Sequence, residues 1–169
     1  MYLPEASVVR MDDATQDAFA YIAITRLQNA YADVVTRRAW PELEHLFEAE
    51  APIHVDTVNA PVIEIVGPTQ LGDFVGSSIE RFEFFEFVIL SAVIEVESAT
   101  EAHGRMYMQE LRQDRSNGGW TDAYGVYHDH YRHDGSKWRF AERHYQSLAR
   151  TGRMDVFPFP SAHARPLGQ

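Results

Sequence analysis

Hydrophobic residues between Asp13 and Thr36 recur at spacings of three and four, the period that gives an α-helix one apolar face. Asp12 or Asp13 can cap the start of this helix. Residues 41–48 predict a shorter helix that opens on a proline, and residues 69–81 predict a third helix. The apolar row expected to face the core of the first helix is Phe19, Ile22, Ala23, Leu27, Ala30, Tyr31 and Val34.

The rest of the chain favours β-strands, because apolar and polar residues alternate there and β-branched or aromatic residues gather in runs. Gly67 and Pro68 are expected to end the second short strand. The predicted strands, in chain order, are 52–58, 61–66, 83–97, 102–113 and the two arms of a long hairpin within 120–148.

The hairpin is expected to turn at Asp134-Gly135, a pair that tolerates the positive φ angles of a tight turn. One face would then be aromatic near the turn and polar further along, which suits a pocket wall. A slip of one residue would exchange the two faces. The pairs on this face are Tyr131 with Trp138, Asp129 with Phe140, Tyr127 with Glu142 and Gly125 with His144.

Helices first and long antiparallel strands after them predict an α+β fold whose sheet buries one face against the helices. Long strands twist and curl, so the sheet and helices would enclose a cone with a concave, apolar interior. Such an interior is the usual setting of a small-molecule site. We expect one domain over residues 14–150, a lead-in over 1–13 and a C-terminal tail over 151–169.

Composition narrows the possible partners. The 169 residues contain no cysteine, so neither a disulfide framework nor a thiolate metal site is available. A net charge of −10 argues against nucleic acid and anionic membranes as general partners. The chain lacks a long uninterrupted apolar run and a signal-like start, so we expect a soluble, cytoplasmic protein.

The segments NAYADVVTRRAWPELEHLFEAEAPIHVD and YHDHYRHDGSKWRFAERHY, with the order of elements, resemble the SnoaL-like group of the NTF2-like, or scytalone dehydratase-like, superfamily. The resemblance covers about residues 14–150 and implies a cone-shaped α+β barrel. Its members include ketosteroid isomerases, polyketide cyclases, dehydratases, limonene epoxide hydrolases and non-catalytic small subunits of ring-hydroxylating dioxygenases. Because one fold carries so many activities, function has to be argued from the site.

Only some of the catalytic positions of the related enzymes have a matching residue in this chain. Tyr31 falls where ketosteroid isomerases keep the tyrosine that donates to the developing enolate oxygen. Val55 falls where they keep their general-base carboxylate, although a one-residue bulge would bring His54 or Asp56 inward.

The acid/base pair of the scytalone dehydratase type is missing, because its aspartate falls on Thr36 and its strand histidine on Phe87. Its second histidine falls near Arg112, and its pocket serine and asparagine fall on Gly125 and Tyr127. A straightforward scytalone-type dehydration is therefore not expected.

Four residues are candidates for catalysis. Tyr31 would stabilise negative charge on a substrate oxygen, or it is a core aromatic. His144, opposite the small Gly125, would carry a proton, or it is structural. His54 and Asp56 share a strand face at a spacing that lets a carboxylate orient an imidazole, or they form a solvated face.

The candidate substrate contacts come from three predicted strands. Tyr127, Asp129 and Glu142 would line the pocket wall, or form a structural network in which Arg139 or Arg143 holds Asp129. Glu110 and Arg112 share a face with Met106 and Met108, and would give an apolar floor ending in a charge pair that grips a carboxylate or phenolate. A surface ion pair is the alternative for Glu110 and Arg112.

The cluster His128, Asp129, His130 and His133 invites a metal interpretation. Strand alternation sends Asp129 to the opposite face from His128 and His130, and arginines are expected beside these histidines, so we predict no metal site. The resemblance implies that the outer sheet face packs subunits, which favours a homodimer or homotrimer. It also implies that the tail from Arg150, with its apolar residues, covers the pocket mouth.

These features favour a cofactor-independent enzyme that acts on a hydrophobic oxygenated small molecule, such as a polyketide, steroid or aromatic intermediate. Its chemistry would be proton transfer of the isomerase, cyclase or dehydratase type. The alternative is a non-catalytic binding protein or a small subunit of a ring-hydroxylating dioxygenase, which the missing dehydratase pair supports.

Overall fold

The computed structural model describes residues 12–151 and residue 157, so the lead-in and most of the C-terminal tail, including its suggested role as a lid, lie outside the described residues. The first helix, α1 (Asp13–Arg37), starts where predicted, because the Asp12 carboxylate accepts a hydrogen bond of 2.7 Å from the backbone N–H of Thr15. It ends at Arg37, and the next residue, Arg38, caps it with a left-handed φ of 59°.

The buried row of α1 differs from the expected one. Phe19 and Ile22 are 58% and 48% exposed, whereas Ala20 and Ile24 are buried. The buried side of α1 is therefore rotated about the helix axis relative to the predicted side. Its buried members are Ala20, Ile24, Leu27, Gln28, Tyr31, Val34 and Val35.

The other two helices differ from prediction at their ends. Residues 41–48 form only a 3₁₀ helix, η1 (Trp40–His45), because Phe47 leaves the helical path to make a parallel bridge with Phe140. Gly67 and Pro68 begin α2 (Gly67–Ile79) rather than simply ending a strand. Gly67 has a φ of +74°, and a Cβ there would lie 2.2 Å from the Ala49 carbonyl oxygen, so only glycine fits.

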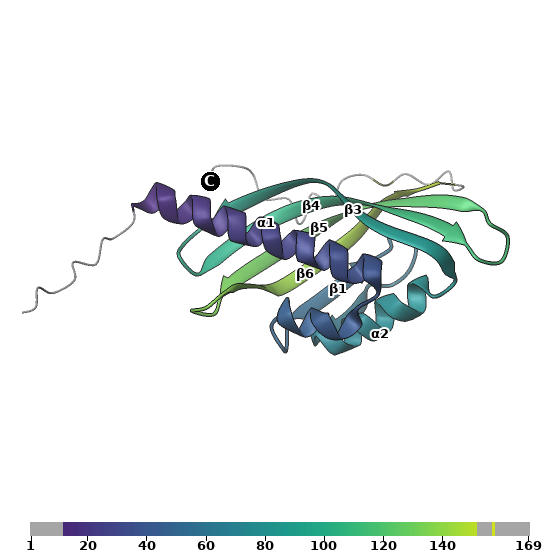
Figure 1. The fold of residues 1–169 in the computed structure, drawn as a ribbon, viewed down its shortest axis with the longest axis horizontal. Helices are drawn as coiled ribbons and strands as arrows, with labels where there is room; N and C mark the ends of the chain where they lie inside the picture. The colour runs from purple at the N-terminus through teal and green to yellow at the C-terminus, as the bar shows by residue number, and fades with distance from the viewer. Residues whose placement is uncertain (1–11, 152–156, 158–169) are drawn as a thin grey trace, which may run out of the picture.

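Six strands form one curved, open sheet, confirming an α+β fold with helices on a curved sheet (Figure 1). The order across the sheet is β2-β1-β6-β5-β4-β3, which leaves β2 and β3 as edges. β1 runs parallel to β6 and every other neighbouring pair is antiparallel. The strands are β1 (Pro52–Asp56), β2 (Ile63–Val66), β3 (Phe82–Val96), β4 (Glu101–Asp114), β5 (Trp120–His133) and β6 (Trp138–Arg150).

The β5–β6 register differs from the predicted one in two steps. The turn lies one residue later than expected, so Tyr131 pairs with Phe140. A bulge then places Ala141 as an extra residue on β6, because His130 pairs with Glu142. From this bulge to Ser147, the β6 side chains lie on the face opposite to the predicted one, and a second register shift follows, where Tyr124 pairs with Ala149.

The core lies between α1 and the concave face of the sheet, which α1 crosses (Figure 1). The Tyr31 ring makes edge-on contacts with four aromatic rings at centroid distances of 5.5–6.1 Å. These rings belong to Phe47, Phe87, Tyr127 and Phe140. Aromatic burial of this kind fixes α1 on the sheet.

Candidate active site on the concave face

A buried ion pair lies at the centre of the concave face. Arg143 donates from Nε and Nη2 to the two carboxylate oxygens of Asp129 at 2.7 and 2.9 Å, and both side chains are fully buried. Tyr131 donates to the same carboxylate at 2.9 Å, and Gln28 donates to the Tyr131 hydroxyl at 2.7 Å. This pair confirms the structural alternative in which Arg143 holds Asp129.

The guanidinium of Arg143 is enclosed by aromatic rings. Its central carbon lies 4.1 Å from the ring centre of Tyr31, 4.3 Å from that of Tyr127 and 4.0 Å from that of Phe140. Burial works against its charge, but the Asp129 carboxylate outweighs burial and raises the pKa of Arg143. The site therefore contains a fixed positive charge beside two tyrosines.

Tyr31 lies on this face, 2% exposed. Burial raises the pKa of the Tyr31 hydroxyl, while the charge of Arg143 and a hydrogen bond with Tyr127 oppose that rise. Both phenols therefore stay protonated near neutral pH and remain hydrogen-bond donors.

Glu110 and Arg112 lie on the same face, from β4, as the alternation of that strand predicted. Their side chains are 22% and 11% exposed, which makes them an inward pair rather than a surface pair. Arg112 Nη1 lies 3.5 Å from Glu110 Oε2, at the limit of a hydrogen bond. Burial raises the pKa of Glu110, and the charges of Arg112 and Arg150 only partly oppose it. Such a carboxyl is suited to exchange a proton.

Tyr145 completes this group from β6, opposite Tyr127, with ring centroids 5.0 Å apart. Burial, followed by the charge of Glu110, raises its pKa, while the neighbouring Ser147 hydroxyl and the charge of Arg150 lower it. Gly125 leaves the space that the Tyr145 ring occupies, since a Cβ at Gly125 would lie 2.3 Å from Tyr145 Cε2. A carboxyl with a raised pKa and several phenol donors therefore share one largely buried face.

The register that places His144 and Glu142 on the concave face with Tyr31 is wrong, and both residues line the outer cavity instead. The bulge at Ala141 turns both residues to the outer, convex face, and Arg143 and Tyr145 take the inner positions. Gly125 pairs with Ser147 instead of His144.

His54 and Asp56 also lie on the outer face. β1 pairs with β2 and β6 without a bulge, so Ile53 and Val55 are the buried residues of this strand. Asp56 accepts a hydrogen bond of 3.1 Å from Gln146 and His54 pairs with Glu64, so neither reaches Tyr31. The bulge that would bring His54 or Asp56 inward is absent, so the pair does not share the concave face with Tyr31.

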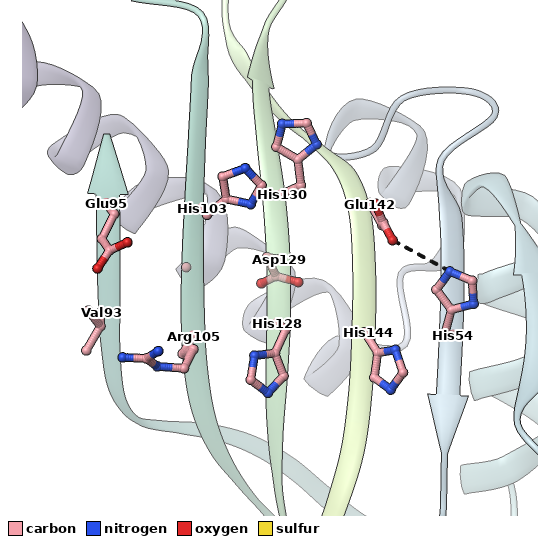
Figure 2. A pocket seen from close by; sticks show the side chains of 11 residues that line it. His54, Val93, Glu95, His103, Arg105, His128, Asp129, His130, Glu142 and His144 are labelled. Atoms are coloured by element: carbon pink, nitrogen blue, oxygen red, sulfur yellow. Dashed lines mark ion pairs between the residues drawn. The ribbon is translucent and has the colours of Figure 1, made fainter. Parts of the chain in front are cut away.

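The outer face instead has its own cavity of about 420 Å³, lined by five histidines from four strands (Figure 2). The His103 and His130 rings stack at 4.4 Å, and the His54 and His144 rings lie 5.7 Å apart. Glutamates hold several of them: His103 lies 3.3 Å from Glu97, and His130 pairs with Glu101. In the described residues, no three His, Asp or Glu side chains are arranged to hold a metal ion.

The sequence prediction missed three inner residues, Arg143, Tyr145 and Arg150. Arg143 and Tyr145 lie beyond the bulge at Ala141, where the predicted alternation is out of step, and Arg150 follows a second register shift near the end of β6. An arginine opposite an inward aspartate was the one available signal, because a buried carboxylate needs a charged partner.

An α+β fold with a curved sheet and buried polar side chains on its concave face is typical of a class of small-molecule-binding proteins. The SnoaL-like domain family matches residues 16–144, most of the chain, and the chain belongs to this family. The resemblance noted from the sequence is therefore confirmed.

Solved structures agree in fold. A protein from Novosphingobium aromaticivorans provisionally assigned as a scytalone dehydratase is 19% identical, with 92% of this chain and 98% of that chain covered and a TM-score of 0.72. A hexachlorocyclohexane dehydrochlorinase from Novosphingobium barchaimii is 18% identical, with 86% and 100% covered and a TM-score of 0.71. An NTF2-like superfamily protein from Salmonella enterica is 17% identical, with 83% and 99% covered and a TM-score of 0.67.

None of the curated proteins compared with this chain matches it. Neither α1 nor any other helix in the described residues has the length and apolar composition needed to cross a bilayer.

Proposed function

We propose that this protein is a cofactor-independent enzyme that catalyses proton transfer on a hydrophobic, oxygenated small molecule, as a lyase or isomerase. The observation that carries the proposal is Glu110, a carboxyl with a raised pKa on an aromatic, largely buried face with tyrosine hydroxyls around it. Solved structures of similar fold include a dehydrochlorinase, whose name describes an elimination reaction.

In this proposal Glu110 removes a proton from a substrate carbon. A base works best when its pKa is near the operating pH, and burial moves Glu110 in that direction. The carboxyl also lies inside the apolar face, where a bound substrate would displace water from it.

Negative charge then develops on a substrate oxygen or leaving group. Tyr127 and Tyr145 are the proposed donors to it, because both remain protonated and lie on neighbouring strands. Tyr31 supports Tyr127 through their hydrogen bond, and the Arg143 charge stabilises negative charge near both phenols. Tyr31 is thus retained in the site, next to the donor rather than paired with a histidine.

The test uses 5-nitrobenzisoxazole, whose ring opens to a coloured phenolate when a base removes its carbon-bound proton. Glu110 acts as a base only when ionised, so the rate should rise with pH through an apparent pKa above the ordinary glutamate value of 4.5. Initial rates across the pH range, recorded by absorbance, give this profile. A rate that does not rise in this range, or does not exceed that of an equal concentration of acetate, would contradict the proposal.

A second prediction concerns Gly125. Gly125→Ala should displace the Tyr145 ring and lower kcat/KM by up to about 100-fold, since small misplacements at a reacting centre are costly. Steady-state kinetics on the same substrate measures the loss. In a Tyr145→Ala background the Gly125→Ala change should add little, because the clash is gone. Equal losses in both backgrounds would show that Gly125 acts elsewhere.

A further inference from the structure

More than one arginine lies near the single carboxyl of Glu110. Besides burial, the strongest electrostatic influences on Arg112 come from Glu110, which favours its charge, and from Arg150 and Arg81, which oppose it. Arg150 also acts on Glu110 and on Tyr145. Two guanidinium groups, those of Arg112 and Arg150, therefore act on one carboxyl, and that carboxyl is itself shifted towards its neutral form. The exposed Arg81 adds positive charge next to Arg112.

This local charge runs against that of the whole chain, which carries a net charge of −10. An excess of positive charge on a largely buried face is costly unless an anion compensates it. Within the described residues, Glu110 is the one carboxylate that forms an ion pair with Arg112. That contact, at 3.5 Å, is too long to satisfy the guanidinium fully.

The geometry of Arg112 leaves donors available. Its Nε is buried and has no hydrogen-bond partner among the described residues. The guanidinium carbons of Arg112 and Arg81 lie 5.2 and 4.7 Å from the ring centre of Phe82, which holds both groups beside an apolar surface. A rigid guanidinium with an unused edge matches the two oxygens of a carboxylate.

We propose that the substrate is an anion, with a carboxylate or phenolate group held by Arg112 and an apolar ring lying against Phe82 and Tyr145. The inference rests on the proposed function only in using the same site, because it concerns binding and not turnover. Arg150 and Arg81 add attraction for the anionic group, and Glu110 stays beside it for the chemistry.

The test compares two probes of nearly equal shape, 2-naphthoate and 2-naphthamide, by fluorescence titration or calorimetry. Naphthoate should bind about 10- to 100-fold more tightly than the amide, because a charged hydrogen bond is lost in the amide. Arg112→Gln should remove this preference while leaving the amide affinity unchanged. Arg112→Lys, which keeps the charge, should retain part of the preference.

Arg105→Gln provides the matched control, since Arg105 lies on the same strand but lines the outer cavity. It removes the same charge and should change neither affinity. The proposal is overturned if naphthoate shows no saturable binding or no advantage over the amide in the unaltered protein. It is also overturned if Arg105→Gln removes the preference as fully as Arg112→Gln does. Because no turnover is measured, failure here leaves the proton-transfer proposal to its own pH–rate test.

Discussion

Replacing Asp129 with alanine is expected to lower the free energy of unfolding by about 3–5 kcal/mol, the largest stability effect we predict for a single side chain. The change leaves the Arg143 guanidinium fully buried without the carboxylate that accepts its two hydrogen bonds. Arg143 Nη1 already lacks a hydrogen-bond partner among the described residues. The unpaired guanidinium would therefore have no replacement acceptor there. The Tyr131 hydroxyl would lose its acceptor as well.

Urea or guanidinium unfolding curves of the two proteins measure this loss. Glu83→Ala is the matched control, because it breaks the ion pair with Arg115 at 2.8 Å, where both side chains are more than half exposed. That exposed pair should contribute at most about 1 kcal/mol. Replacing both buried partners, as Asp129→Leu with Arg143→Met, should restore much of the stability. A loss below about 1 kcal/mol for Asp129→Ala would mean that the pair contributes little.

The helices could be predicted closely because their signals are local. A three-to-four spacing and an aspartate before the first turn define α1 to within one residue of its end. The rotation of its buried row could not be predicted, since which ridge faces the sheet depends on packing with Phe87 and Tyr127. The same reason explains η1, which ends early because Phe47 pairs with Phe140, a residue far along the chain.

The bulge at Ala141 separates the site residues that could be predicted from those that could not. β4 pairs with β5 without a register shift, so alternation correctly places Met108, Glu110 and Arg112 inward. β6 carries an extra residue at Ala141, and the residues from there to Ser147 change face. Nothing in the local sequence around Ala141 indicates a bulge. Arg143 needs the inward position to meet Asp129, and this tertiary contact, with the burial of Tyr145, accounts for the register.

The bulge also separates two groups of chemically active side chains. It sends His144 and Glu142 to the outer cavity, where His54 and His130 lie, and leaves the concave face with tyrosines, arginines, Glu110 and the Asp129 that pairs with Arg143. Proton transfer on the concave face must then use a carboxyl rather than an imidazole. This is why the pKa of Glu110 matters more to the proposed chemistry than the eight histidines of the chain.

Glu110→Gln is expected to change activity and stability in opposite directions. Removal of the proposed base should lower kcat/KM for 5-nitrobenzisoxazole by about 10²- to 10⁴-fold. Burial disfavours the ionised carboxyl, so the folding contribution of Glu110 is fully present below its unfolded pKa and is lost as pH rises through its folded pKa. At neutral pH the glutamine protein should therefore be the more stable one, and the difference should vanish in acid.

Kinetics and unfolding curves at neutral and acidic pH measure the two effects in the same samples. Glu142→Gln is the control, because it makes the same chemical change on the outer face, where the side chain is 51% exposed. It should alter stability by no more than about 0.5 kcal/mol and leave the rate unchanged. If Glu110→Gln lost stability together with activity, the Arg112 contact would outweigh the cost of burial, and Glu110 would be a structural partner of Arg112. A gain in stability together with a loss of rate would instead identify Glu110 as a base. Its buried environment then costs stability but supports its reactivity.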